Sequence, residues 1–544
     1  NDKLVTNRAL YCQRLDLFVP TAQFRATKPT VSQPIMKNPR LLTLLFTTGL
    51  LALPVCMAST PSVETAATVE TATVSQPVLQ DDAFVPMSRT VDHRKFRVLQ
   101  NEFKSGPEVT QACLTCHEDA AKQVHKTVHW TWEKEQASTG KMLGKINVVN
   151  NFCVGVTSNW RRCTSCHIGY GWKDSKFDFT AEDKVDCLVC HDQTGKYKKF
   201  PPGAGNPQMD PKGKEFPKGS GKIWKPVDLR MVAQNVGPTR RENCLTCHAK
   251  GGGGDAVKHG DIDMSLVNPE FALDVHMSPE GFNFDCSVCH KSDNHAIQGS
   301  RLDMNPGQDH GVLTCEACHS DDPHTKKKKA LNLHNRIACQ TCHIPAYARK
   351  TPTKMSWDWT TAGQKKDGKG VVKKEDGVLV YHYKKGGFVW EKNVTPTYAW
   401  FNGQMNYVTL DDVIDPSNIV SLAYPSGDID DEKAVIYPFK VHTGKQLYDN
   451  KLNKMVLPHL MPYKKGDKTA YWASFDWQIA VTEGMKAAGK EYSGSYDWVE
   501  TEMYWPTTHM VAPAEDTVDC KACHVEDGLM KDVPGLGTDW IELY

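Results

Sequence analysis

The chain repeats one short motif eight times, a Cys-x-x-Cys pair followed directly by histidine. Sixteen of its 19 cysteines belong to these motifs. This is the attachment motif of haem c, in which two thiols bond to the haem and the adjacent histidine binds its iron. The spacing predicts eight covalent haem c groups. Their attachment residues are Cys113, Cys116 and His117; Cys163, Cys166 and His167; Cys187, Cys190 and His191; Cys244, Cys247 and His248; Cys286, Cys289 and His290; Cys315, Cys318 and His319; Cys339, Cys342 and His343; and Cys520, Cys523 and His524.

Paired cysteines also occur in zinc sites and in disulfide frameworks. A structural zinc site takes four ligands, usually as two separated pairs, and has no use for a histidine after every pair. A disulfide framework gives no reason for that histidine either. The repeated histidine therefore favours haem over both alternatives.

Thirteen of the 21 histidines lie outside the motifs. A six-coordinate, low-spin haem needs a second axial ligand, which in multihaem proteins is most often another histidine. The predicted distal iron ligands are His93, His129, His259, His276, His295, His324, His334 and His509. The remaining five are expected to be surface or structural residues: His125, His310, His382, His442 and His459.

The N-terminal region has the pattern of a secretory signal. Met36 precedes two basic residues, an apolar run over residues 41–55 and a small-residue cleavage site at Ala58. We therefore expect a signal peptide over residues 36–58, with residues 1–35 as an upstream extension without an assigned role. An uncleaved membrane anchor is the alternative. Because haem attachment to this motif follows export, the predicted location is the periplasm.

Composition and charge narrow the partners. The hydrophobic fraction is 40% and the mean hydropathy is −0.49, which is typical of a soluble globular protein. Residues 1–58 hold seven Lys/Arg and two Asp/Glu, so their removal would change the formal charge from +1 to −4. This charge disfavours nucleic acid as a partner. The predicted partners are a small inorganic oxyanion as substrate and an electron-donor cytochrome that is periplasmic or membrane-associated.

The elements that must position the haems divide the chain into regions. Residues 59–88 are rich in Thr, Val, Ala, Ser and Pro and are predicted to be a flexible linker. Residues 89–345 hold seven motifs among many glycines and prolines, which favours short helices and long loops. Residues 346–544 return the eighth motif, with hints of strands over 381–410 and a helical spacing over 475–490. The predicted fold is mainly α with much irregular structure and few short strands, a multihaem cytochrome c fold packed around eight covalent haems.

Outside the motifs, several longer stretches carry a resemblance to a known family. Over roughly residues 90–530 the chain resembles the octahaem tetrathionate reductase family of c-type cytochromes. The matching stretches are Val109–His117, His129–Trp132, Asn150–Cys153, Cys163–Asp174, Gly251–Asp261, Asp274–Met277, Ala338–Pro345 and Thr501–Pro513. The resemblance implies close stacked and perpendicular haem pairs, seven bis-histidine haems and an active-site haem on the second motif with lysine as its distal ligand. It also implies reduction of tetrathionate, and of nitrite and hydroxylamine in vitro.

Two residues are singled out as catalytic. Lys258, beside His259 after four glycines, is the predicted lysine ligand, and Lys173 is the alternative. A lysine binds iron only as the neutral amine, which requires a lowered pKa. Cys153 is the one cysteine after residue 58 outside the motifs, and is either a reactive thiol or a buried apolar residue.

Three functions follow from these features. The first is a reductase that passes electrons through bis-histidine haems to a lysine-ligated haem, where tetrathionate becomes thiosulfate. The second is a pure electron-transfer cytochrome in which every iron is saturated. The third is a hydroxylamine or hydrazine oxidoreductase.

Overall fold

The computed structural model describes residues 90–152, 155–300, 313–464 and 466–537. The predicted signal peptide, the predicted linker, Cys153 and His310 lie outside these ranges. Within the described ranges, no helix is long and apolar enough to cross a membrane.

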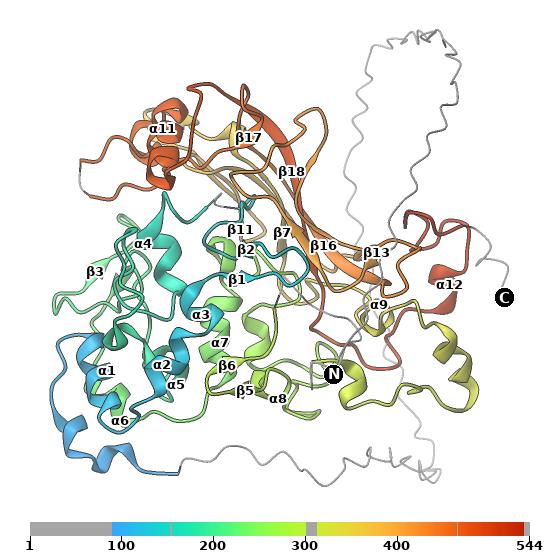
Figure 1. Cartoon of the computed structure of the whole chain (residues 1–544), viewed down its shortest axis with the longest axis horizontal. Coiled ribbons are helices and arrows are strands. Elements are labelled where there is room, and N and C mark those ends of the chain that lie inside the picture. The colour runs from blue at the N-terminus through green and yellow to red at the C-terminus, as the bar shows by residue number, and fades with distance from the viewer. Residues whose placement is uncertain (1–89, 153–154, 301–312, 465, 538–544) are drawn as a thin grey trace, which may run out of the picture. The chain divides into compact units, whose positions relative to one another are not determined.

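Short helices and loops make up the first half of the described chain (Figure 1). Haem motifs begin three of these helices, α5, α8 and α9, and α5 is capped by the acidic residue just before its first cysteine. This residue, Asp186, accepts a hydrogen bond from the backbone N–H of Val189 at 3.1 Å. The helices are α1 (Gly106–Leu114), α2 (Ala120–His125), α3 (Val128–Thr131), α4 (Trp160–Cys163), α5 (Cys187–His191), α6 (Leu229–Gln234), α7 (Arg241–His248), α8 (Cys286–Cys289) and α9 (Cys339–His343).

A ten-stranded mixed sheet occupies most of residues 353–506. Its main path runs β10-β11-β12-β7-β16-β18-β15-β14, and β13 and β17 also pair with β16. The strands are β7 (Thr353–Asp358), β10 (Val372–Glu375), β11 (Val378–His382), β12 (Gly386–Glu391), β13 (Thr397–Phe401), β14 (Met405–Tyr407), β15 (Val420–Pro425), β16 (Val435–Asp449), β17 (Lys454–Met455) and β18 (Tyr496–Pro506).

The sheet contradicts the expectation of a mainly α fold with few short strands, since the protein is 24% helix and 22% strand. The reason lies in the core of this region, where no haem motif supplies a porphyrin to bury. Aromatic and β-branched side chains, including Trp357, Phe401 and Phe439, are fully buried along the strands instead. Such residues pack well on a pleated surface, so a sheet forms here.

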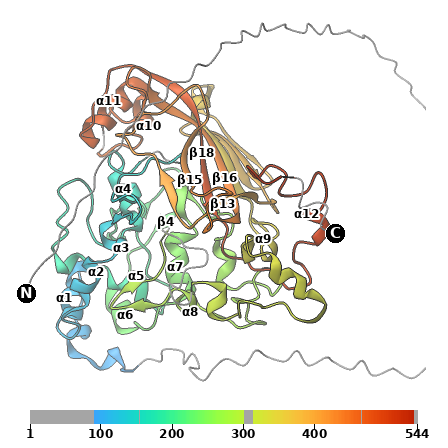
Figure 2. The same ribbon diagram turned by 45° about the vertical axis from the view of Figure 1, so that its right-hand side comes forward.

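The helix expected in this half is present, and the eighth motif lies beside the seventh. Helix α11 (Trp477–Ala488) falls within residues 475–490 and ends at Gly489, whose φ is +65°. Helix α12 (Cys520–Cys523) carries the eighth motif back to the seventh, because Val518 donates to the carbonyl of Cys342 at 3.0 Å. Figure 2 shows α9 and α12 near one end of the sheet, α5, α7 and α8 below it, and α1 and α4 on the left of the view.

Candidate functional site

Seven of the eight motif histidines face a second histidine ring. The ring centroids of all seven pairs lie 6.0–6.5 Å apart. Seven of the eight predicted distal histidines are among the partners. The pairs are His117 with His93, His191 with His295, His248 with His129, His290 with His509, His319 with His276, His343 with His324, and His524 with His334.

The spacing of these rings fits an iron between them. An imidazole nitrogen binds a metal at about 2 Å and the ring centre lies about 1 Å further, so rings on opposite sides of one metal are about 6 Å apart. Rings in direct contact lie closer, as His459 and Tyr463 do at 4.1 Å. All sixteen motif cysteines are free of disulfide bonds. At these seven motifs the residues present therefore fit a covalent haem with two histidine ligands.

The other ring nitrogen, Nδ1, is held in several of these pairs. A hydrogen bond at Nδ1 fixes the ring orientation, so that Nε2 points toward the metal. The Nδ1 partners are Gly237 O for His191 (2.9 Å), Gln298 O for His290 (3.0 Å), Gln123 Oε1 for His295 (2.8 Å), Asn332 Oδ1 for His324 (2.9 Å) and Asp261 Oδ2 for His509 (3.2 Å).

Cysteines of different motifs lie next to one another and define the order of the haem sites. Thiols of the first and third, second and fourth, fourth and fifth, and sixth and seventh motifs are within hydrogen-bonding reach. Cysteines of the third and fourth, fifth and sixth, and seventh and eighth motifs interact electrostatically. The motifs therefore form one path, 1-3-4-5-6-7-8, and the second motif is joined to the fourth.

The second motif differs from the other seven. The ring of His167 is fully buried, and its ring neighbours among the described residues are three tryptophans and two phenylalanines. Its Nε2 lies 2.7 Å from the carbonyl oxygen of Trp130. Burial lowers the pKa of His167 to about 3, so the ring is neutral. Among the described residues His167 thus faces no second histidine ring, and its Nε2 lies against a backbone carbonyl group.

Lys258 and His259 lie on a loop that is anchored to the sheet. The Nζ of Lys258 is 4.5 Å from the ring centre of Trp505, and the ring of His259 meets the same indole edge-on at 5.1 Å. Burial, followed by the charges of His129 and Lys258, lowers the pKa of His248 to about 3. The Lys258 amine is therefore close to the fourth motif, which adjoins the second.

Lysines that the sequence did not single out lie nearer to the second motif. Lys145 and Lys199 both act electrostatically on Cys166 and His167. Lys199 is buried, donates to the carbonyl oxygen of His167, and forms an ion pair with Asp186 at 2.9 Å. Lys173, the alternative ligand, is exposed. Nothing in the sequence around Lys199 marks it as buried. Its ion-pair partner, Asp186, lies before the third motif and not near Lys199 or the second motif in the sequence.

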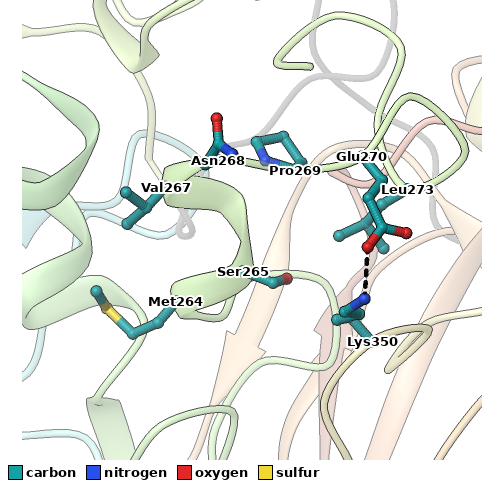
Figure 3. A pocket seen from close by; sticks show the side chains of 8 residues that line it. All are labelled: Met264, Ser265, Val267, Asn268, Pro269, Glu270, Leu273 and Lys350. Carbon is teal, nitrogen blue, oxygen red and sulfur yellow. Dashed lines mark hydrogen bonds and ion pairs between the residues drawn. The ribbon is translucent and has the colours of Figure 1, made fainter. Parts of the chain in front are cut away.

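Among the pockets on the described surface, two differ in their relation to the motifs. One of about 260 Å³ lies beside the 3-10 turn η6 (Met264–Val267) and carries the ion pair of Lys350 and Glu270 at 2.7 Å (Figure 3). No motif residue lines it. A larger pocket of about 470 Å³ is lined by Gly155 and Thr157, and the Cys163 thiol lies 3.9 Å from the Gly155 carbonyl oxygen. This larger pocket therefore adjoins the second motif.

Comparisons with known proteins agree with these features. The family model for bacterial cytochrome c matches residues 354–527. An uncharacterized protein of Archaeoglobus fulgidus is 24% identical over 261 residues, which is 40% of this chain and 83% of that protein. The crystal structure of an octahaem cytochrome c from Shewanella oneidensis is similar with a TM-score of 0.71 and 47% identity, covering 80% of this chain and 94% of that one. With this identity over almost the whole of the octahaem protein, the chain belongs to the octahaem tetrathionate reductase family of multihaem c-type cytochromes.

Proposed function

We propose that this protein is a periplasmic reductase that delivers electrons at its second motif to tetrathionate. One observation carries the proposal: His167 is the one motif histidine that faces no second histidine ring among the described residues. An iron with two histidine ligands can transfer electrons but has no open position for a substrate. The one chemically different motif is therefore the best candidate for the reaction site.

The position of the second motif in the electron path supports the same conclusion. Cys166 is within hydrogen-bonding reach of Cys247 in the fourth motif, whereas the remaining motifs continue along a single path. A site linked to this path at the fourth motif can receive electrons from it, which suits a site of substrate reduction. The pocket lined by Gly155 and Thr157 adjoins this motif, which is consistent with access for a small substrate.

The charges near the second motif suit an anionic substrate. Tetrathionate is a dianion, and cationic side chains in a cleft raise the local concentration of anions. Lys145 and Lys199 act on the second motif, and Lys258 acts on the adjoining fourth motif. Nitrite, a smaller anion, would be attracted by the same lysines, and hydroxylamine is a further candidate substrate.

We assign two residues to the chemistry. In this proposal Lys258 would bind the second haem in the resting protein and leave it to admit substrate, and the Cys153 thiolate attacks the central S–S bond of tetrathionate. One thiosulfate leaves with the electron pair of that bond, and a mixed disulfide of Cys153 and thiosulfate remains. Two electrons, which the bound haems would supply, break this disulfide into the second thiosulfate and the Cys153 thiolate.

The test is a reductase assay on the purified protein with all its haems. Reduced viologen dye should be oxidised when tetrathionate is added, with two thiosulfates formed per tetrathionate and two viologens oxidised. Nitrite and hydroxylamine are assayed in the same way. Electron paramagnetic resonance should show one haem distinct from seven bis-histidine haems. No turnover of any of the three substrates, together with eight equivalent bis-histidine signals, would favour a pure electron-transfer protein instead.

A further inference from the structure

Asp261 forms a hydrogen bond to a histidine of the fifth haem site. His509 faces His290 of the fifth motif, with ring centroids 6.3 Å apart. The Nδ1 of His509 lies 3.2 Å from Oδ2 of Asp261 and 2.8 Å from the hydroxyl oxygen of Thr508. The same Asp261 oxygen accepts the backbone N–H groups of Thr508 at 2.8 Å and of His509 at 3.1 Å. The carboxylate is thus fixed against the ring.

This contact contrasts with the hydrogen bonds of other paired histidines. His295 bonds to the amide oxygen of Gln123, and His324 bonds to the amide oxygen of Asn332. His191 and His290 bond to backbone carbonyls. All four of these acceptors are neutral. At His509 the acceptor is a carboxylate that is only 3% exposed.

A carboxylate acceptor changes the ring as a ligand. It pulls on the Nδ1 proton, which makes the imidazole a more basic ligand through Nε2. A more basic ligand stabilises Fe(III) over Fe(II), and hydrogen bonds to axial ligands are among the means by which a protein sets haem potentials. Because Asp261 is buried, little solvent screens its charge. Three donors meet the same oxygen of Asp261, namely the ring Nδ1 of His509 and the backbone N–H groups of Thr508 and His509, and such bonds favour the ionised carboxylate.

We propose that Asp261 lowers the reduction potential of the fifth haem, so that this haem has a lower reduction potential than its neighbours in the middle of the electron path. The fifth motif connects the two halves of that path. Its Cys286 is within hydrogen-bonding reach of Cys244 in the fourth motif, and its Cys289 interacts with Cys318 in the sixth. Electrons on the sixth to eighth haems would therefore cross uphill to reach the first four. The proposal does not depend on which substrate is reduced.

The test is a redox titration of the purified eight-haem protein, followed by visible absorption and electron paramagnetic resonance. In Asp261→Asn the neutral side chain keeps an oxygen for the backbone N–H groups but lacks the charge. The reduction potential of one of the eight haems should rise by about 59 mV, which corresponds to an Fe(II)/Fe(III) ratio about tenfold higher at a fixed potential for a one-electron couple. The resonance of one bis-histidine haem should change with it.

Asp274→Asn is the matched control. Asp274 is 2% exposed, and its carboxylate accepts backbone N–H groups of His276 and Met510 at 2.9 Å each. Asp274 acts on His509 through charge and has no hydrogen bond to its ring. The shift in reduction potential in Asp274→Asn should therefore be clearly smaller than the shift in Asp261→Asn. Equal shifts in the two variants, or no shift in Asp261→Asn, would overturn the proposal.

A converse variant keeps the test decisive if Asp261→Asn fails to take up eight haems. Gln123→Glu places a carboxylate at Nδ1 of His295, where the acceptor lies 2.8 Å away and is exposed. One component should then move to lower potential, by less than tenfold because solvent screens an exposed charge. If all eight components stay in place in Gln123→Glu, a carboxylate at this nitrogen does not set the potential and the proposal is wrong.

Discussion

Lys440, whose side chain is buried in the sheet, donates a hydrogen bond to the backbone carbonyl of Lys258 at 3.1 Å. Its ammonium also donates to the carbonyl of Val257 at 3.1 Å and to the hydroxyl of Thr353 at 2.5 Å. Thr353 in turn donates to the carbonyl of Ala256 at 2.6 Å. The three N–H groups of the Lys440 ammonium thus meet three acceptors. Through Lys440 and Thr353, strands β16 and β7 fix the loop that carries the proposed lysine ligand, Lys258.

Replacing Lys440 by methionine should loosen this loop. The variant loses charged hydrogen bonds and leaves two buried carbonyls without their donor, which costs about 3 kcal/mol of unfolding free energy. Hydrogen exchange of residues 252–261 should become faster. Lys354→Met is the control, because Lys354 is equally buried but lies over the rings of Trp357 and Phe388 at 3.9 and 3.6 Å. Unaltered hydrogen exchange in Lys440→Met would show that the hydrogen bonds of Lys440 do not hold this loop in place.

Lys258→Ala should alter the spectrum of one haem and lower turnover of both tetrathionate and nitrite by tenfold or more. The reason is that the proposed ligand and a cationic group are lost together. Lys173→Ala is the matched control, since Lys173 is exposed, and it should leave spectrum and turnover as they are. If Lys258→Ala keeps the parent spectrum while Lys173→Ala changes it, the two assignments must be exchanged.

Cys153→Ala should separate the substrates. Tetrathionate reduction by the proposed covalent step needs the thiol, so its kcat should fall by a hundredfold or more. Nitrite needs no sulfur nucleophile, so its turnover should stay within about threefold of the parent value. Both rates are measured with reduced viologen. Full tetrathionate turnover in Cys153→Ala would rule out the covalent step.

Asp467→Asn should destabilise the protein in a pH-dependent way. Asp467 accepts bonds from the ring of His459 at 3.2 Å and from the backbone N–H of Tyr463 at 2.9 Å. Burial tends to raise its pKa, but the bonds from Thr469, Tyr463 and His459 outweigh this and lower the pKa well below 3.8. A carboxyl group whose pKa is lower in the folded than in the unfolded state stabilises the fold at pH values above its unfolded pKa. This stabilisation is lost as the pH falls below the unfolded pKa toward the folded one.

At pH 7 the variant should therefore unfold more easily by about 2 kcal/mol, and this difference should shrink below pH 4. Denaturant unfolding of the eight-haem protein from pH 7 to pH 3 measures it. Asp411→Asn serves as the control, because its ion pair with Lys490 is largely exposed and should contribute little. A difference that stays constant down to pH 3 would contradict the role assigned to the carboxylate.

The haem-attachment residues could be predicted because the chemistry demands a fixed local spacing. The sequence could not predict which distal histidine faces which motif. His129 lies between the first and second motifs in sequence, yet it faces His248 of the fourth. Such pairs depend on the folding of loops around porphyrins, which leaves no periodic signal in the sequence. The sequence also gave no sign that His442, expected at the surface or in a structural role, is fully buried against Phe152.

The sheet was missed for a related reason. Strands β16 and β18 pair over eleven positions, from Phe439 with Pro506 to Asp449 with Tyr496. The burial of β16 does not alternate cleanly, because β16 has five consecutive buried residues, whereas β18 alternates from Val499 to Trp505. A strand packed on both faces lacks the polar-apolar alternation that identifies a strand in a sequence. Its length and its aromatic and β-branched residues were the remaining signals.

In the proposed reductase, the link of the second motif to the fourth would separate conduction from catalysis, because the other seven motifs are linked to one another without it. An inhibitor at the second motif would then stop turnover and leave the seven other sites in contact from the first to the eighth. Such a protein would store more electrons than one two-electron turnover requires when its substrate is scarce. Both electrons could then be delivered to the proposed substrate tetrathionate from within the molecule, before another encounter with an electron donor.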